Sequence, residues 1–227
     1  MRIVTNHKLV KRNSTIGRYS MYAGMALLVA ALVVNFLAFQ RPELIYLVLV
    51  GFLVGFTLTT IGTLLNNRWG RKADERLADS LKGLDDRYTL YNYRLGAQHV
   101  LAGPMGVMVL YPKFHTGPIL YDGKKWHNPG ARKTVFGLFD PDPLGNPILE
   151  AAGEVEALNK QLTRRSAEIK VPPQAAVVFL SSHAELQAKA APLPVLHYKQ
   201  LKDYVRKLPK DSTATADQLA QLDAAAA

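Results

Sequence analysis

The fold of the longer part of the chain is decided by the stretch Gln98–His127, which reads QHVLAGPMGVMVLYPKFHTGPILYDGKKWH. Two apolar runs, 99–102 and 107–111, flank a Gly-Pro-Met-Gly turn, and glycine and proline between apolar runs predict a β-hairpin. A second Gly-Pro pair at 117–118 opens another apolar run, and Asp-Gly at 122–123 suits a turn with positive φ. We therefore predict a meander of about four strands.

This stretch resembles the core of the nuclease-related domain, a member of the PD-(D/E)xK nuclease superfamily. The family typically shows Asp-His-Val-Leu-Val-Gly-Pro-x-Gly-Val-Phe-Val-Ile-Glu-x-Lys, followed by Gly-x-Ile and an aromatic residue. The positions that match this pattern are His99, Val100, Leu101, Gly103, Pro104, Gly106, Val107, Val109, Lys113, Gly117, Ile119 and Trp126. Two positions differ: Gln98 stands where the family has Asp, and Tyr111 stands where it has Glu.

The resemblance covers about residues 70–208 and implies a restriction-endonuclease-like mixed sheet flanked by helices. The pattern around it agrees, because apolar spacing predicts amphipathic helices over 73–84 and 147–162 and a closing helix over 199–208. Tyrosine-rich alternation predicts a first strand over 88–95, and the apolar run 175–180 predicts a buried strand. A short strand over 193–196 completes the expected α/β domain.

Two long uncharged runs precede this domain, over residues 19–39 and 44–65. Roughly 20 residues at about 1.5 Å rise span the hydrocarbon core, and Pro42 breaks the pattern between the runs, so we predict a transmembrane helical hairpin. Basic residues flank both ends of the hairpin, and residues 1–18 contain no acid. This bias predicts a multi-pass plasma-membrane protein with both termini on the cytoplasmic side, and hence a cytoplasmic α/β domain.

The expected organisation is therefore a basic cytoplasmic arm (1–18), a transmembrane hairpin (19–65), a nuclease-related-like domain (70–208) and a flexible Ala-rich tail (209–227). Gly51 and Gly55 in the second run allow close helix approach, either within the hairpin or with another membrane protein. The partners we expect are thus the lipid bilayer and other membrane proteins.

The chain has 227 residues, a net charge of +10 and no cysteine, which excludes disulfides and thiolate metal sites. The positive charge suits anionic membranes or nucleic acid. Lysines interleaved with aromatic residues in the meander, among them Lys124 and Lys125, suit the same two partners.

The resemblance implies metal-assisted phosphodiester hydrolysis, in which an Asp and a Glu hold a Mg²⁺ ion and a Lys lies near the attacking water. When the family's site residues are matched to this chain by position, Lys113 and Glu75 remain as remnants of that site and both central carboxylates are missing. Gln98 offers one neutral oxygen and Tyr111 a protonated phenol, which are weak ligands for Mg²⁺. We therefore expect no metal and no cofactor, and Mg²⁺ only if the site has been rebuilt elsewhere.

Three hypotheses follow. The first is a membrane-anchored, non-catalytic binding or scaffolding protein, or accessory subunit of a membrane complex, built on a degenerate nuclease-related domain (a pseudoenzyme). The second is a membrane-tethered nuclease with a displaced metal site, formed by Glu75 with Asp122 or Asp140, although Asp-Gly and Asp-Pro are usually turn residues. The third is a nucleic-acid tether that does not cleave.

Overall fold

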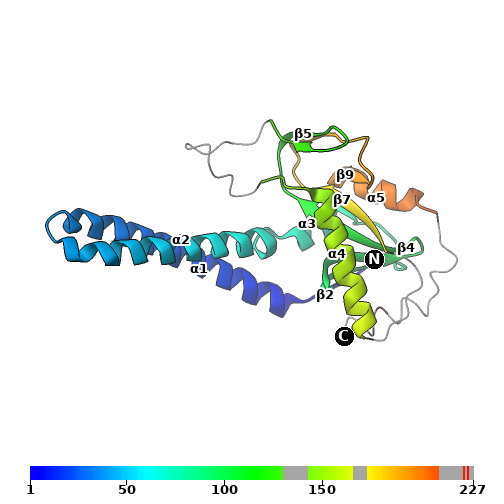
Figure 1. Cartoon of the computed structure of the whole chain (residues 1–227). Coiled ribbons are helices and arrows are strands. Elements are labelled where there is room, and N and C mark those ends of the chain that lie inside the picture. The colour runs from blue at the N-terminus through cyan, green and yellow to red at the C-terminus, as the bar shows by residue number, and fades with distance from the viewer. Residues whose placement is uncertain (130–142, 166–172, 210–221, 223, 225–227) are drawn as a thin grey trace. The chain divides into compact units, whose positions relative to one another are not determined.

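The computed structural model describes residues 1–129, 143–165, 173–209, 222 and 224. The chain divides into two units, one formed by His7–Lys72 and the other by Met1–Asn6 together with Ala73–Ala227 (Figure 1). We expected residues 1–18 to form an arm ahead of the hairpin. Instead, the first six residues belong to the α/β domain, and the long helix begins at His7.

The first unit consists of two long antiparallel helices. Helix α1 spans His7–Ala38, a short 3₁₀ turn spans Pro42–Leu44, and α2 spans Ile45–Trp69. Both helices are long and apolar enough to cross a membrane by length and composition. They extend beyond the predicted runs because polar residues at their ends continue the helical hydrogen bonding.

Small residues line the contact between α1 and α2. Glycine lets two backbones approach closely, and a Cβ added at Gly55 would lie 3.0 Å from Leu28 Cγ and 3.1 Å from the Gly24 carbonyl oxygen. A Cβ at Gly51 would lie 2.9 Å from Ala31 Cβ. Gly51 and Gly55 therefore pack within the hairpin, and a contact with another chain through them would compete with this packing.

Threonine hydroxyls in α2 bond to their own helix rather than across the hairpin. Thr59 Oγ1 donates to the Gly55 carbonyl at 2.8 Å, and Thr63 Oγ1 donates to the Thr59 carbonyl at 2.8 Å. These bonds satisfy the hydroxyls internally, so the helix contact depends on close packing of small residues.

The second unit holds a six-stranded mixed sheet in the order β1-β2-β3-β4-β7-β9. The strands are β1 (Arg2–Thr5), β2 (Thr89–Leu95), β3 (Ala97–Gly103), β4 (Gly106–Lys113), β7 (Gln174–Phe179) and β9 (Val195–His197). The predicted hairpin is confirmed, because β3 and β4 pair antiparallel with Gly103 opposite Gly106. Strands β1–β2, β4–β7 and β7–β9 pair in parallel.

The predicted single meander is wrong beyond β4. Strands β5 (Gly117–Tyr121) and β6 (Trp126–His127) leave the main sheet and join β8 (Ala184–Gln187) in a second sheet of order β6-β5-β8. The turn between β5 and β6 forms as expected, but β5 also pairs in parallel with β8, a partner more than 60 residues away in the sequence. Local turn chemistry carries no signal for such a distant partner.

Helices cover both faces of the main sheet, as expected for a mixed sheet flanked by helices. Helix α4 (Pro147–Arg164) covers one face, and α3 (Ala73–Ser80) and α5 (Tyr198–Lys207) cover the other. Alternate residues of β7 serve the two sides: Val177 and Phe179 join the α4-side cluster, whereas Ala176 and Val178 join the α3/α5-side cluster. Burial on both faces explains why this strand is a continuous apolar run.

Strand β1 forms one edge of the sheet. Its Arg2 N–H donates to the Tyr88 carbonyl at 2.9 Å, and the Asn6 N–H donates to the Asn92 carbonyl at 3.0 Å. Asn92 Nδ2 also donates to Thr5 Oγ1 at 3.0 Å, and Asn92 Oδ1 lies 2.8 Å from Nδ1 of the buried His99. The helical hairpin is thus an insertion between the first and second strands of the domain.

Most of the predicted flexible tail (209–227) lies outside the described residues. Leu222, which is described, is fully buried and belongs to the α4-side cluster. At this position the chain packs on the domain, contrary to our expectation of a flexible tail.

Candidate functional site

The positions singled out by the nuclease-related pattern gather on the α4 face of the sheet. Gln98 on β3 bonds to α4, Tyr111 on β4 packs against the α4-side cluster, and Lys113 at the end of β4 forms an ion pair with α4. They share this face because alternate strand residues point the same way. The structure therefore places Gln98, Tyr111 and Lys113 on one face of the sheet.

Lys113 is paired with an acid from the first turn of α4. Its Nζ lies 2.6 Å from Glu150 Oε2, and the Lys113 residue is only 9% exposed. The same Nζ lies 5.5 Å from the centre of the Tyr111 ring. Gly145 makes room for this acid: its φ is +64°, and a Cβ there would collide with Glu150 Oε1. The lysine charge is thus compensated within the domain.

Gln98 is held by a second acid, one turn further along α4. The Gln98 backbone N–H donates to Glu154 Oε2 at 2.7 Å, and its side-chain Nε2 donates to Glu154 Oε1 at 2.8 Å. Both carboxylate oxygens of Glu154 therefore accept hydrogen bonds from one residue. The side chain thus donates to a carboxylate through Nε2, and the acceptor it retains is the neutral amide oxygen Oε1, a weak ligand for Mg²⁺ compared with a carboxylate. An Asp at position 98 would instead face Glu154 with a like charge.

The other predicted site residues lie elsewhere. Glu75 is exposed on α3, the helix whose buried side packs on the opposite face of the sheet. Asp122 Oδ1 accepts from the backbone N–H groups of Lys125 at 2.7 Å and Lys124 at 2.8 Å, and its Oδ2 lies 3.0 Å from His127 Nε2. These hydrogen bonds, those from the two backbone N–H groups first, lower the pKa of the Asp122 carboxyl to about 2. Asp122 is therefore a turn residue.

Asp140, the other predicted substitute, lies outside the described residues. Within the part of the chain that the structure describes, no three His, Asp or Glu side chains come together as a metal-binding group. At the positions where the family binds its metal, this chain has the Gln98 amide, the Tyr111 phenol and Lys113. The nearby carboxylates of Glu154 and Glu150 already contact Gln98 and Lys113. These residues do not fit the Mg²⁺ ion that the family resemblance implies.

Glu150 and Glu154 are the residues that sequence reasoning missed. The buried residues of helix α4 are Pro147, Ala151, Leu158 and Leu162. Glu154 falls within the 3–4 residue spacing of that buried stripe. Burying an acid costs free energy unless the acid is paired. The spacing of Glu154 therefore indicated, from the sequence, a partner for it on the sheet.

Comparison with known proteins agrees with this architecture. Residues 69–180 match the family model described as the nuclease-related domain, and this range contains all of the site residues described above. This part of the chain is therefore a nuclease-related domain. No curated protein and no solved structure matches the chain significantly.

Proposed function

We propose that this protein is a membrane-anchored, non-catalytic binding or scaffolding protein, an accessory subunit of a membrane complex, whose nuclease-related domain has become an interaction module. The observation that carries the proposal is the pairing of Gln98 with Glu154. It turns a metal-ligand position into a donor to a carboxylate, while Glu150 compensates Lys113. In the family a lysine and a metal ion would act together on a phosphate. In this chain Lys113 and Gln98 instead contact the carboxylates of Glu150 and Glu154.

Membrane anchoring is supported by the length and surface of the helices. Helices α1 and α2 have 32 and 25 residues, so at about 1.5 Å per residue both exceed a hydrocarbon core of about 30 Å. Only 11% of the residues in each most apolar window are buried, which is unlike the core helix of a soluble protein. Large apolar side chains, among them Phe36 and Leu53, point away from the hairpin.

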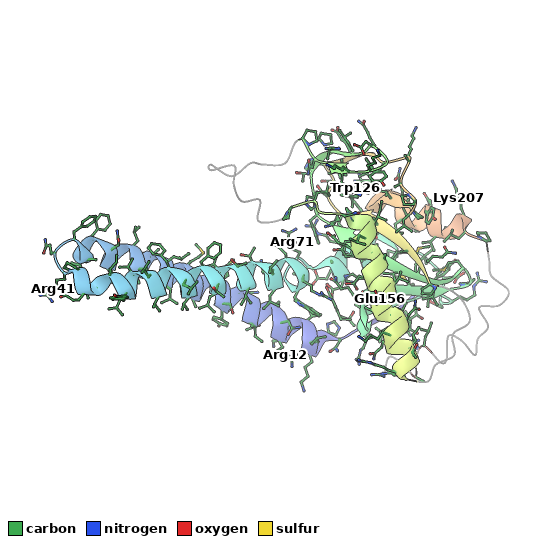
Figure 2. The ribbon with its side chains drawn as sticks, in the orientation of Figure 1. Arg12, Arg41, Arg71, Trp126, Glu156 and Lys207 are labelled. Atoms are coloured by element: carbon green, nitrogen blue, oxygen red, sulfur yellow. The ribbon has the colours of Figure 1, made fainter. Side chains whose placement is uncertain are left out.

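The charge distribution supports the predicted topology. Residues 1–72 hold nine of the 28 basic residues and one of the 18 acidic residues. Arg12 and Arg71 lie near the open end of the hairpin, and Arg41 lies at its turn (Figure 2). Because β1 and β2 pair in one sheet, the segments before α1 and after α2 would lie on the same side of the membrane. By the positive-inside rule we place that side in the cytoplasm, with the plasma membrane as the location.

The same distribution argues against a nucleic-acid tether. After residue 72 the chain holds 19 basic and 17 acidic residues, so the domain itself is nearly neutral. Nucleic-acid affinity depends on a concentrated basic surface that releases counterions. The excess positive charge therefore supports membrane association better than DNA binding.

The test is a cleavage assay on the full chain in phosphatidylcholine nanodiscs, with single- and double-stranded DNA in Mg²⁺ and in Mn²⁺. We expect no cleavage by the natural chain or by Lys113→Ala. Metal-dependent cleavage that is lost in Lys113→Ala and kept in the surface control Lys125→Ala would overturn the proposal.

A repair variant sharpens this test. Gln98→Asp, Tyr111→Glu and Glu154→Gln together would restore both family carboxylates and remove the acid that opposes them. We expect Mn²⁺ binding, followed by electron paramagnetic resonance, in this variant and not in the natural chain. Equal Mn²⁺ binding by both would show that the natural site already holds a metal.

The interaction role has its own test. Cross-linking in native membranes, followed by purification through the full chain, should yield a membrane protein in fixed stoichiometry. Recovery of the chain alone, together with DNA cleavage, would favour the tethered nuclease.

A further inference from the structure

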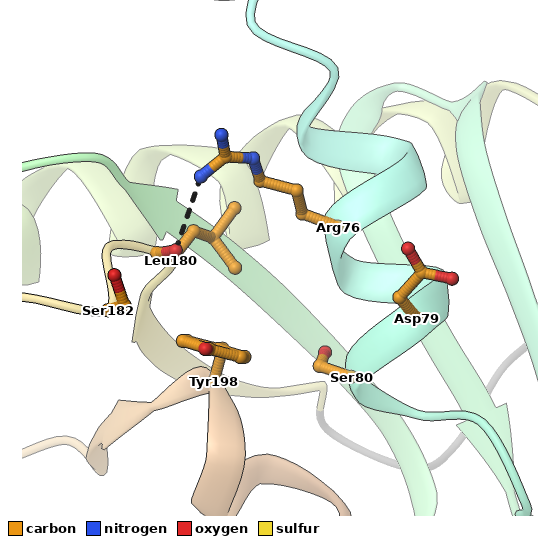
Figure 3. Close-up of a pocket in the computed structure, with 6 residues that line it drawn as sticks. All are labelled: Arg76, Asp79, Ser80, Leu180, Ser182 and Tyr198. Atoms are coloured by element: carbon orange, nitrogen blue, oxygen red, sulfur yellow. Dashed lines mark hydrogen bonds between the residues drawn. The ribbon is translucent and has the colours of Figure 1, made fainter.

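A separate cavity lies on the α3/α5 side of the domain, at the end of β7. Its volume is about 290 Å³, and it is lined by Arg76, Asp79, Ser80, Leu180, Ser182 and Tyr198 (Figure 3). None of these residues belongs to the Gln98–Lys113 site on the opposite face. The volume is close to the lower limit of small-molecule pockets, which span about 300–1,000 Å³, so the cavity suits a small ligand.

Two opposite and solvent-exposed charges, Arg76 and Asp79, line this open cavity and do not pair with each other. Arg76 and Asp79 are three residues apart on α3, a spacing at which such side chains commonly form an ion pair. Arg76 is instead held in another direction: its Cζ lies 5.4 Å from the Phe114 ring centre, and Nη1 donates to the Leu180 carbonyl at 3.4 Å. Figure 3 shows the guanidinium lying over Leu180 and away from the Asp79 carboxylate. Among the described residues, Arg76 and Asp79 form no ion pair with each other.

Hydroxyl groups complete the lining. Ser80 Oγ donates to the Leu77 carbonyl at 2.8 Å, so its lone pairs remain available as acceptors. The hydroxyls of Ser182 and Tyr198 also line the cavity and make no hydrogen bond to any other residue in the described part of the chain. A guanidinium with two hydroxyl donors suits an oxyanion, and a carboxylate with a hydroxyl acceptor suits an ammonium.

We propose that this cavity binds a small zwitterion, with a phosphate or carboxylate at Arg76 and a primary ammonium at Asp79. A ligand with separated opposite charges satisfies both side chains, whereas a simple anion would face the Asp79 carboxylate. Phosphoethanolamine has this chemistry, either as a soluble ester or as the headgroup of a lipid. The inference is independent of whether the Lys113 site is catalytic.

The experiment is a calorimetric titration of the full chain in phosphatidylcholine nanodiscs with O-phosphoethanolamine. We expect saturable binding that Arg76→Gln and Asp79→Asn each weaken at least tenfold, because each variant removes one charge-assisted contact. The matched controls Lys82→Gln and Asp203→Asn remove exposed charges outside the cavity and should bind as the natural chain does.

A second probe tests the role of the ammonium. Phosphocholine carries no N–H donor, so it should bind several-fold more weakly to the natural chain, and Asp79→Asn should abolish this difference. Absence of saturable binding, equal affinity for inorganic phosphate and phosphoethanolamine, or unchanged affinity in both cavity variants would overturn the proposal.

The lipid composition of the nanodiscs distinguishes the two sources of the ligand. If phosphatidylethanolamine in place of phosphatidylcholine weakens the apparent binding of the soluble probe, the headgroup occupies the cavity. If the affinity is the same in both lipids, the cavity binds the soluble ester.

Discussion

Replacing Glu150 with Gln should destabilise the domain, because it leaves the Lys113 ammonium without its counter-charge. Lys113 is 9% exposed and its Nζ lies 2.6 Å from Glu150 Oε2. Removing one partner of a fully buried ion pair costs roughly 3–5 kcal/mol. The Glu150 side chain is 34% exposed, so water screens part of this interaction, and we expect a loss of about 2 kcal/mol. For a chain of this size that corresponds to a fall in Tm of about 4–8 °C.

The assay is thermal unfolding of the full chain in nanodiscs, followed by tryptophan fluorescence. The chain has two tryptophans, so Trp69→Phe leaves Trp126, which packs against the α4-side cluster, as the reporter. The control is Glu156→Gln, which removes an exposed acid from the same helix (Figure 2). It should change Tm by less than about 1–2 °C, since surface substitutions usually stay within about 0.5 kcal/mol.

A double-mutant cycle with Lys113→Met decides whether the pair is the cause. Met keeps an unbranched side chain one atom shorter than that of Lys and removes its charge, so it should recover most of the stability lost in Glu150→Gln. If Glu150→Gln costs no more than Glu156→Gln, or if the losses of the two single variants simply add, the structural role of the pair is refuted.

Three further predictions concern the hairpin, the β5–β6 turn and the sheet edge. Gly24→Ala should splay α1 from α2, since its Cβ would lie 2.5 Å from a backbone nitrogen of α2; double electron–electron resonance across the helices measures this. Lowering the pH from 3.8 toward 2 should loosen the β5–β6 turn, because folding lowers the pKa of Asp122. The contribution of the Asp122 carboxylate to the stability of the turn is present above pH 3.8 and is lost as the pH falls through about 2. The amide NMR shifts of the turn measure this loss. Thr5→Val should speed hydrogen exchange in β1, because it removes the hydrogen bond from Asn92.

Each of these has an outcome that contradicts it. A Cβ added at Gly153 on α4 would meet no atom within 4 Å, so Gly153→Ala is the matched glycine control. Equal separations of α1 and α2 in both variants would contradict the close-packing argument. A turn that keeps its amide shifts down to pH 2 would show that Asp122 does not hold it. Unchanged exchange in Thr5→Val, compared with the control Ile3→Thr at an exposed position of the same strand, would show that β1 does not depend on the Asn92 bond.

Local chemistry made much of the fold predictable. The β3–β4 hairpin follows from Gly103 and Gly106 between apolar runs, and α4 begins where Asn146 accepts from the Leu149 N–H at 3.3 Å, as an N-cap residue does. Strands β1 and β8 were missed, because each is four residues long and is defined by a partner distant in the sequence. Such pairing leaves no periodic signal in the strand itself.

The candidate site was predictable only in part. Gln98, Tyr111 and Lys113 share a face because strand alternation fixes it. Their partners Glu150 and Glu154 depend on how α4 is rotated about its axis. Apolar residues lie on two sides of α4 and left that rotation ambiguous. The contacts of Glu150 with Lys113 and of Glu154 with Gln98 could therefore be found only from the structure.

The place of β1 ahead of the hairpin has a consequence for proteolytic release. A protease that cuts once between α2 and α3 would leave the domain attached, because Arg2–Thr5 stays hydrogen-bonded along β2 and continues into α1. Shedding of the domain would require either a second cut, after Asn6, or extraction of the edge strand from the sheet. A fragment that begins at Ala73 would carry an open β2 edge, which is a template for aggregation.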